Sequence, residues 1–130
     1  MVENLFDELN LLLFKVSNLI VKRIMDNYFF IKTGYKIQKI LVNEIVYIES
    51  MGDYIRFFLE DKKIVTLLSM SKVIELLPKQ KFIQIHRSYI INFEKINFIQ
   101  NNIISIGKYQ LPISKSRKKE LMDVINSKLL

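Results

Sequence analysis

Hydrophobic residues recur at helical spacing through the first 26 residues of the chain. Successive members of one apolar stripe are three or four positions apart: Val2, Leu5, Leu9, Leu12, Val16 and Leu19. The stripe is widened by Phe6, Leu13 and Ile20, and no proline or glycine interrupts it. This spacing predicts one amphipathic helix over residues 1–26. Such a helix packs on its own domain, links the chain to another domain, or joins two subunits, and the pattern leaves these alternatives open.

From Tyr28 onward the pattern changes to short runs rich in isoleucine, valine, phenylalanine and tyrosine, such as "YFFIKT", "EIVYIES" and "YIRFFLE". These residues favour strands. Turn-prone pairs separate the runs, namely Thr33-Gly34, Gly52-Asp53, Asn101-Asn102 and Gly107-Lys108. Parallel strands need a crossover of a dozen or more residues, which most of these connections cannot supply. The sequence therefore predicts about eight to ten short antiparallel strands.

Two short helices are predicted within this β-rich part. "SMSKVIELL" (69–77) has helical spacing, Ser69 or Ser71 can cap its start, and Pro78 ends it. The second helix begins at Ser114 or Ser116 and continues to the end of the chain. We place the boundary at Asn27, which gives an N-terminal helix over 1–27 and a mainly β domain over 28–130.

The stretch "KFIQIHRSYIIN" (81–92) places polar residues inside an apolar alternation. Arg87 shares its odd-numbered frame with Ile83, Ile85, Tyr89, Ile91 and Phe93. Burying an unpaired guanidinium there would cost several kcal/mol. We therefore expect the strand to bulge or end, which exposes His86, Arg87 and Ser88 at a sheet edge. Two alternatives stay open: an ion pair of Arg87 with an acid such as Glu49, and a structural hydrogen bond of His86 in the core.

Charge is unevenly distributed along the chain. The formal net charge is +7, and residues 1–27 hold four acids and three bases, which leaves 17 bases against 9 acids in the remainder. The segment 107–119 contains five bases and no acid. A basic concentration of this kind is typical of a nucleic-acid binder, although basic runs also occur on ordinary solvated surfaces.

Residues suited to catalysis or metal binding are scarce. The chain has no cysteine and a single histidine, His86, so neither a thiolate site nor a histidine metal site can form within one chain. Its three glycines lie at 34, 52 and 107, too scattered for a phosphate-binding loop. We expect no enzymatic activity, no metal and no cofactor.

Membrane association and secretion are also disfavoured by the sequence. No apolar run approaches the roughly 20 residues that span a bilayer. The start, "MVENLFDELN", carries acids where a secretory signal would carry positive charge. We expect a cytoplasmic protein.

The basic segment "ISKSRKK" (113–119) coincides with the predicted start of the last helix. Free N–H groups and the positive dipole end of a helix attract phosphate. Lys115, Arg117, Lys118 and Lys119 would reinforce that attraction. Together with an exposed Arg87, which can donate two parallel hydrogen bonds to guanine, these residues favour nucleic-acid binding.

Taken in order, "YIES", "GDYI", "LLSMSKVIELLP", "FIQIHRSYIIN" and "LPISKSRKK" resemble the LytTR family (LytR/AlgR type). These are DNA-binding domains at the C-termini of many bacterial response regulators. The resemblance runs from about Phe29 to Leu129. It implies an elongated stack of three antiparallel sheets with short helices. It also implies that loops, rather than a recognition helix, enter successive major grooves of a bent duplex.

The resemblance also implies contact residues. The family's DNA-contacting segments correspond here to Met51, Gly52, Asp53 and Tyr54; to His86, Arg87 and Ser88; and to Lys115, Ser116, Arg117 and Lys118. Family members often have arginine at the position of Lys115. Because lysine is a point charge rather than a planar fork, bidentate reading of guanine is not expected there.

The beginning of the chain departs from the family pattern. A two-component response regulator of this type starts with a receiver domain, which residues 1–26 are too few to form. We expect a transcription regulator that binds double-stranded DNA at promoter repeats as a homodimer. The alternative is a protein-interaction module in which helix 1–26 binds a receiver domain or another partner protein and the basic face is incidental.

Overall fold

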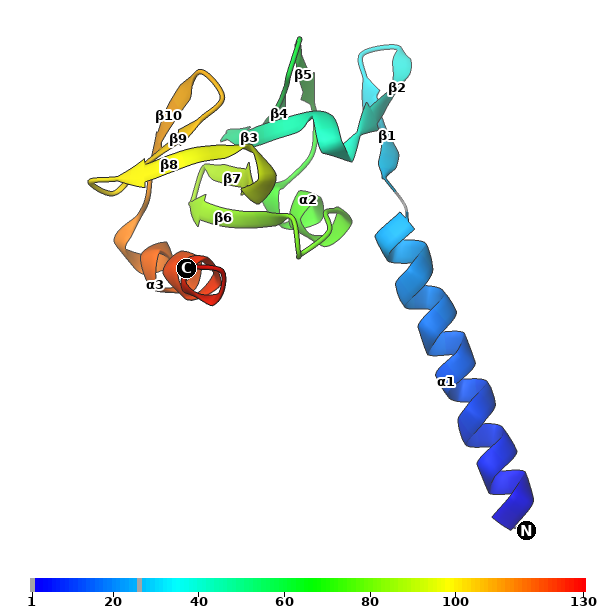
Figure 1. The fold of residues 1–130 in the computed structure, drawn as a ribbon. Coiled ribbons are helices and arrows are strands. Elements are labelled where there is room, and N and C mark those ends of the chain that lie inside the picture. Colours follow the sequence, from blue (N-terminus) through cyan, green and yellow to red (C-terminus); the bar gives the residue numbers. More distant parts are fainter. Residues whose placement is uncertain (1, 26) are drawn as a thin grey trace.

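The computed structural model describes residues 2–25 and 27–130, and within them it contains three helices and ten strands (Figure 1). The helices are α1 (Val2–Met25), α2 (Met70–Leu76) and α3 (Lys115–Ser127). The strands are β1 (Tyr28–Thr33), β2 (Lys36–Leu41), β3 (Ile45–Met51), β4 (Tyr54–Leu59), β5 (Lys63–Thr66), β6 (Phe82–His86), β7 (Tyr89–Asn92), β8 (Ile96–Gln100), β9 (Ile103–Ile106) and β10 (Tyr109–Pro112). Short 3-10 turns lie at Val42–Glu44 and Phe93–Lys95.

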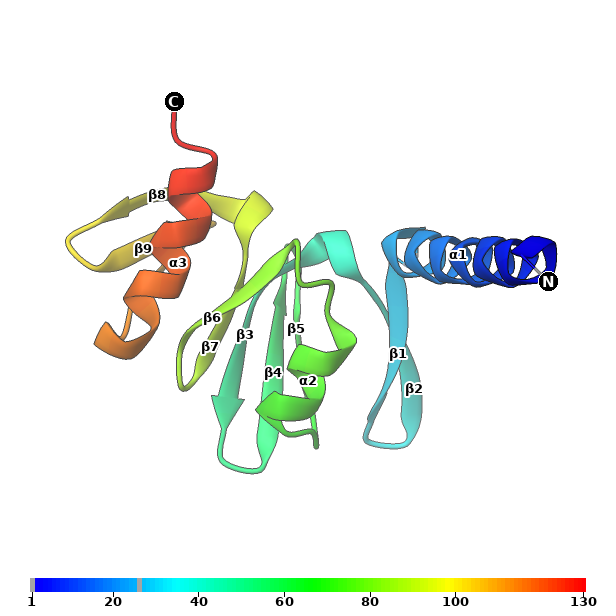
Figure 2. The same cartoon turned by 90° about the horizontal axis from the view of Figure 1, so that it is seen from below.

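The strands form three antiparallel sheets, as the sequence predicts. A five-stranded sheet in the order β5-β4-β3-β7-β6 lies between the β1-β2 hairpin and a three-stranded sheet in the order β10-β9-β8 (Figures 1 and 2). Every strand pair in the described residues is antiparallel. The expected fold class, mainly β with an elongated series of sheets, is confirmed.

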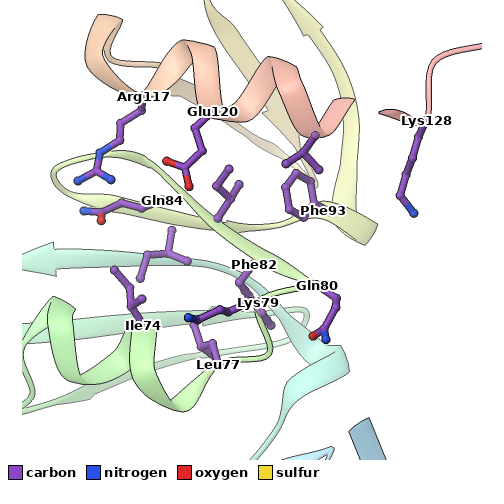
Figure 3. A pocket seen from close by; sticks show the side chains of 13 residues that line it. Ile74, Leu77, Lys79, Gln80, Phe82, Gln84, Phe93, Arg117, Glu120 and Lys128 are labelled. Atoms are coloured by element: carbon purple, nitrogen blue, oxygen red, sulfur yellow. The ribbon is translucent and has the colours of Figure 1, made fainter. Parts of the chain in front are cut away.

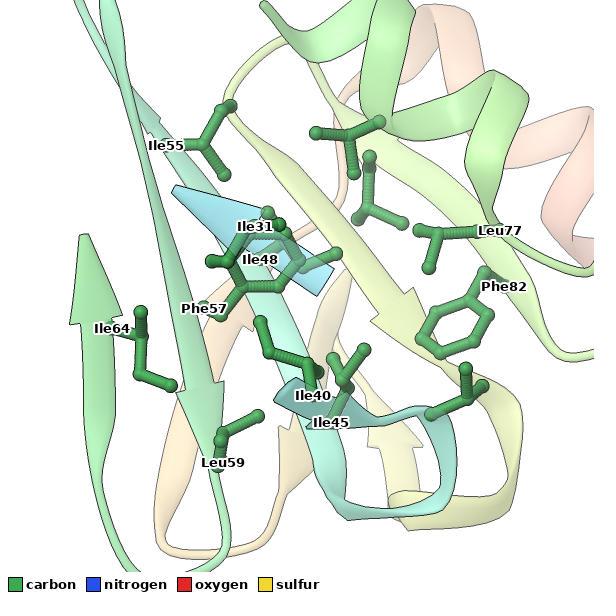
Figure 4. Close-up of a cluster of buried hydrophobic side chains, with 13 residues drawn as sticks. Ile31, Ile40, Ile45, Ile48, Ile55, Phe57, Leu59, Ile64, Leu77 and Phe82 are labelled. Atoms are coloured by element: carbon green, nitrogen blue, oxygen red, sulfur yellow. The ribbon is translucent and has the colours of Figure 1, made fainter. Parts of the chain in front are cut away.

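Two hydrophobic cores lie on opposite faces of the five-stranded sheet. The first joins that sheet to the β1-β2 hairpin and to α2, and Ile40, Ile48 and Phe57 are fully buried there (Figure 4). The second joins the sheet to β9, β10 and α3, where Ile85, Ile104 and Leu121 are fully buried. Because both faces are covered, this sheet meets solvent mainly at its edge strands and at the turns that join its strands.

The turns form where the sequence places them. Asn101 and Asn102 both have positive φ, 53° and 62°, which is the backbone of a tight two-residue hairpin. Gly52 (φ 64°) occupies the corresponding position between β3 and β4. In α2, the Ser69 hydroxyl accepts a hydrogen bond from the Lys72 N–H (3.3 Å), which confirms Ser69 as the cap.

The N-terminal helix extends away from the sheets (Figures 1 and 2). Its predicted range, 1–26, agrees with the observed Val2–Met25, while Met1 and Asp26 lie outside the described residues. None of the helices in the described residues is long and apolar enough to cross a bilayer.

Candidate nucleic-acid interface

The "HRS" stretch forms the turn between β6 and β7. His86 is paired with Tyr89, so Arg87 and Ser88 are the tip of a hairpin rather than positions inside a strand. The strand register shifts between Gln84 and His86, which removes Arg87 from the apolar frame of its neighbours. The expected bulge or strand end is confirmed, with Arg87 exposed, whereas His86 and Ser88, which were also expected to be exposed, are half-buried.

Backbone hydrogen bonds hold three predicted segments side by side. The Ser50 N–H donates to the Ser88 carbonyl (2.9 Å), which joins the β3–β4 turn to the β6–β7 turn. The Ser114 N–H donates to the Ile85 carbonyl (2.9 Å), which joins the start of α3 to the same β6–β7 turn. Figure 2 shows all three along the lower side of the sheets. We call this set the basic edge, defined as Met51–Tyr54, His86–Ser88 and Ser114–Lys118.

Positive charge on the basic edge is accessible. The side chains of Arg87, Lys115 and Lys118 are exposed, and none takes part in an ion pair within the described part of the chain. Arg87 does not pair with Glu49. The Glu49 carboxylate instead forms an ion pair with Arg56 of the neighbouring strand, with 3.9 Å between Glu49 Oε1 and Arg56 Nη1. The cations are therefore free to meet an external anion.

His86 has a local structural role at this edge. Its Nδ1 atom accepts a hydrogen bond from the Ser88 N–H (3.1 Å), and its ring lies 5.2 Å from that of Tyr89. Since Nδ1 accepts, the ring proton in this arrangement is assigned to Nε2. The alternative of a structural hydrogen bond for His86 is therefore correct for the bond itself. The residue is half-buried at the β6–β7 turn, however, and not inside the core.

The β3–β4 turn contributes a mostly exposed tip. Gly52, Asp53 and Tyr54 are exposed, and Met51 is half-buried at the end of β3. Asp53 brings a negative charge to the basic edge. Carboxylates accept hydrogen bonds from the exocyclic amine of cytosine, so this residue suits a base rather than a phosphate.

The first turn of α3 presents its cations in two directions. Lys115, Ser116 and Lys118 are exposed, whereas Arg117 is half-buried. Arg117 lies over a groove of about 630 Å³ between α2 and α3, near Gln84 and Glu120 (Figure 3). The structure therefore brings Lys115 and Lys118 to the outer surface of the basic edge and turns Arg117 toward this groove.

Gln84 is a residue of this region that the sequence does not single out. Its side-chain nitrogen donates to the Arg87 carbonyl at 3.4 Å and it lines the groove below Arg117. In the sequence it is an ordinary polar position of an alternating strand, and nothing there signals this contact. Its position follows from the register shift beside it.

The three antiparallel sheets present basic turns at one edge, and such a surface is typical of a nucleic-acid binder. A sequence profile of the LytTr DNA-binding domain matches residues 35–126. The chain therefore belongs to the LytTr DNA-binding domain family, a family of DNA-binding domains and not of enzymes.

A solved structure has the same fold. It is the LytTr DNA-binding domain assigned to a methyl-accepting/DNA response regulator from Bacillus cereus, with a TM-score of 0.68 and 22% sequence identity. The match covers 77% of this chain and 97% of that one. A search among curated proteins gave no match.

Proposed function

We propose that this protein is a transcription regulator that reads a specific double-stranded DNA sequence through the turns of its basic edge. In this proposal residues 28–130 are the DNA-binding domain, residues 1–27 connect subunits or partners, and the protein acts in the cytoplasm. Two subunits occupy tandem half-sites in a promoter, as part of a response-regulator or two-component pathway. Membership of a DNA-binding family supports the choice of duplex DNA as the partner.

One observation carries the proposal. Two backbone hydrogen bonds, from Ser50 to Ser88 and from Ser114 to Ile85, hold three segments at one edge, and two of these segments carry accessible cations. Phosphate contacts fix the position of a protein on a duplex, and contacts to base edges supply specificity. Lys115 and Lys118 suit phosphates as point charges, while the exposed Arg87 has the planar fork that recognises guanine.

Selection of bound fragments from a random DNA pool tests this function. We expect a repeated motif to be enriched by the 130-residue chain. On that motif, Arg87→Ala and Lys115→Ala should each weaken binding by about 1–3 kcal/mol. Lys62→Ala is the matched control, because Lys62 is also exposed but lies in the β4–β5 connection, at the opposite end of the β3 and β4 strands from the β3–β4 turn. Equal losses in all three variants, or no enriched motif, would contradict the proposal.

A second candidate function is a protein-interaction module. It is favoured by the apolar stripe of α1, on which Leu5, Leu12 and Leu19 are 69%, 58% and 60% exposed. In this case a receiver domain or another protein covers the stripe and the basic edge is incidental. The random-pool selection separates the two candidates, since an interaction module without a DNA function enriches no sequence.

A further inference from the structure

The apolar stripe of α1 is not covered by the rest of the chain. All described side chains of this helix, residues 4–19, are exposed, and Leu9 and Val16 are 53% and 48% exposed. The helix extends away from the sheets in both views (Figures 1 and 2). A continuous apolar stripe of this kind on a helix is typically covered by another helix.

Charge is segregated along α1. Residues 2–13 contain the acids Glu3, Asp7 and Glu8 and no base, whereas residues 14–25 contain the bases Lys15, Lys22 and Arg23 and no acid. Two copies of the helix that run in opposite directions can set an acid from residues 2–13 of one beside a base from residues 14–25 of the other, as the register described below does for Glu8 and Lys15. In copies that run in the same direction, the g position Glu8 faces an apolar e position and gains no opposite charge.

The heptad positions agree with an antiparallel pair. Leu5, Leu12 and Leu19 occupy d positions, and Leu9 and Val16 occupy a positions. In an antiparallel pair an a residue packs beside a d residue of the other helix. One register places Leu9 beside Leu12 of the partner subunit, and it also places Leu5 beside Val16 of the partner subunit.

The same register pairs the flanking charges. Glu8 and Lys15 both occupy g positions, which face g positions in an antiparallel pair. The register set by the leucines places Glu8 beside Lys15 of the partner subunit, and by symmetry this pair forms twice. Neither residue has a charged neighbour three or four positions away in its own helix, so both charges are available. In a parallel pair Glu8 would instead face Leu13 of the partner subunit.

We propose that α1 is a self-association helix, which binds α1 of a second copy in antiparallel orientation and in the register that joins Glu8 to Lys15 of the partner subunit. This inference rests on the proposed function, because it specifies what holds the two DNA-binding subunits together. The antiparallel pair places the two DNA-binding domains at opposite ends of the helices. This separation allows each DNA-binding domain to bind its own half-site.

Charge reversal tests the orientation. We measure the dimer dissociation constant of the 130-residue chain by sedimentation for the unchanged protein, Glu8→Lys, Lys15→Glu and the double variant. Each single change replaces two attractions with two repulsions and should weaken the dimer about tenfold. The double variant restores both pairs and should return to within about threefold of the unchanged protein. Equal dissociation constants for all four proteins, a monomer at every concentration, or a tetramer would each overturn the proposal.

Spin-label distances test the register directly. The chain has no cysteine, so Asn10→Cys and Ser17→Cys each introduce a unique labelling site on the exposed b positions of α1. In the proposed register the two Asn10→Cys labels are offset by roughly 2 Å along the axis, and the two Ser17→Cys labels by roughly 20 Å. A parallel pair predicts the same distance for both variants, and that result would overturn the antiparallel orientation.

DNA binding is measured in parallel so that the two proposals can fail separately. If α1 does not self-associate but the basic edge reads DNA, the chain sediments as a monomer and still enriches a single half-site. If α1 pairs but the domain does not read DNA, dimers form and no motif is enriched. The first result overturns only the helix pairing, and the second overturns only the proposed function.

Discussion

Asn92 provides a quantitative test of how the basic edge is supported. It ends β7, the strand that begins directly after the β6–β7 turn, and its side chain is fully buried. Its amide nitrogen donates to the Ile45 carbonyl at 2.9 Å, and its amide oxygen accepts from the Glu94 N–H at 3.0 Å. The side chain thus joins the end of β7 to the start of β3.

Asn92→Ala removes both hydrogen bonds at once. Ile45 is fully buried, so its carbonyl cannot exchange the lost bond for water, and an unsatisfied buried group costs about 2 kcal/mol. The Glu94 N–H loses an ordinary capping hydrogen bond, which costs about 1 kcal/mol. We expect the free energy of unfolding to fall by about 3 kcal/mol.

Urea unfolding followed by circular dichroism measures this loss. The midpoint should decrease while the slope with urea concentration stays unchanged. Asn97→Ala is the matched control, because Asn97 also donates to a carbonyl, that of Gly107, at 3.0 Å, but in an exposed position. Its loss should stay below about 1 kcal/mol. Equal losses in the two variants would refute the argument that burial determines the cost.

Three further predictions concern the basic edge and the second core. If about six phosphates are neutralised, the logarithm of DNA affinity should fall with the logarithm of salt concentration with a slope of roughly −5, and a slope near zero in a salt titration would contradict the phosphate contacts. Burial, followed by the negative charge of Glu49, raises the pKa of Tyr47 above its ordinary value of 10.0, so the folded protein retains this proton more strongly than the unfolded chain. The free energy of unfolding should therefore fall as pH rises above about 10, by up to ~1.4 kcal/mol per pH unit, and Tyr47→Phe should show a smaller fall in alkaline denaturation curves. Gly52→Ala meets no atom within 4 Å but forces alanine to a φ of 64°, so it should cost about 1 kcal/mol in thermal unfolding through backbone strain alone.

Local features of the fold could be predicted from the sequence because their causes are local. Ser69 and Pro78 define α2, and the pair Asn101-Asn102 forms the turn between β8 and β9 as predicted. The exposure of Arg87 could also be predicted, since burying an unpaired guanidinium among isoleucines costs several kcal/mol.

Other features depend on contacts between distant segments, which periodicity does not encode. The bond from Ser114 to Ile85 joins positions on two different elements, and it decides that the start of α3 lies beside the β6–β7 turn. The inward direction of Arg117 follows from the packing of α3 over the groove, not from the run "SRKK" itself. The contact between Gln84 and the Arg87 carbonyl depends in the same way on a register shift of one strand.

In the proposed function, the motif at 81–92 serves DNA binding through Arg87, just before β7, and structural support through Asn92, at the end of β7. Just before its beginning, Arg87 is an exposed side chain on a turn whose position is set by backbone hydrogen bonds, so replacing Arg87 removes an exposed cation and leaves the turn in place. At its end, Asn92 is a buried side chain that makes the joining bonds itself. Arg87→Ala should consequently weaken DNA binding with no loss of stability, and Asn92→Ala should lower stability with little change in the affinity of the molecules that remain folded. If Arg87→Ala and Asn92→Ala lowered stability and DNA affinity in the same proportion, the assignment of DNA binding to Arg87 and of stability to Asn92 would be wrong.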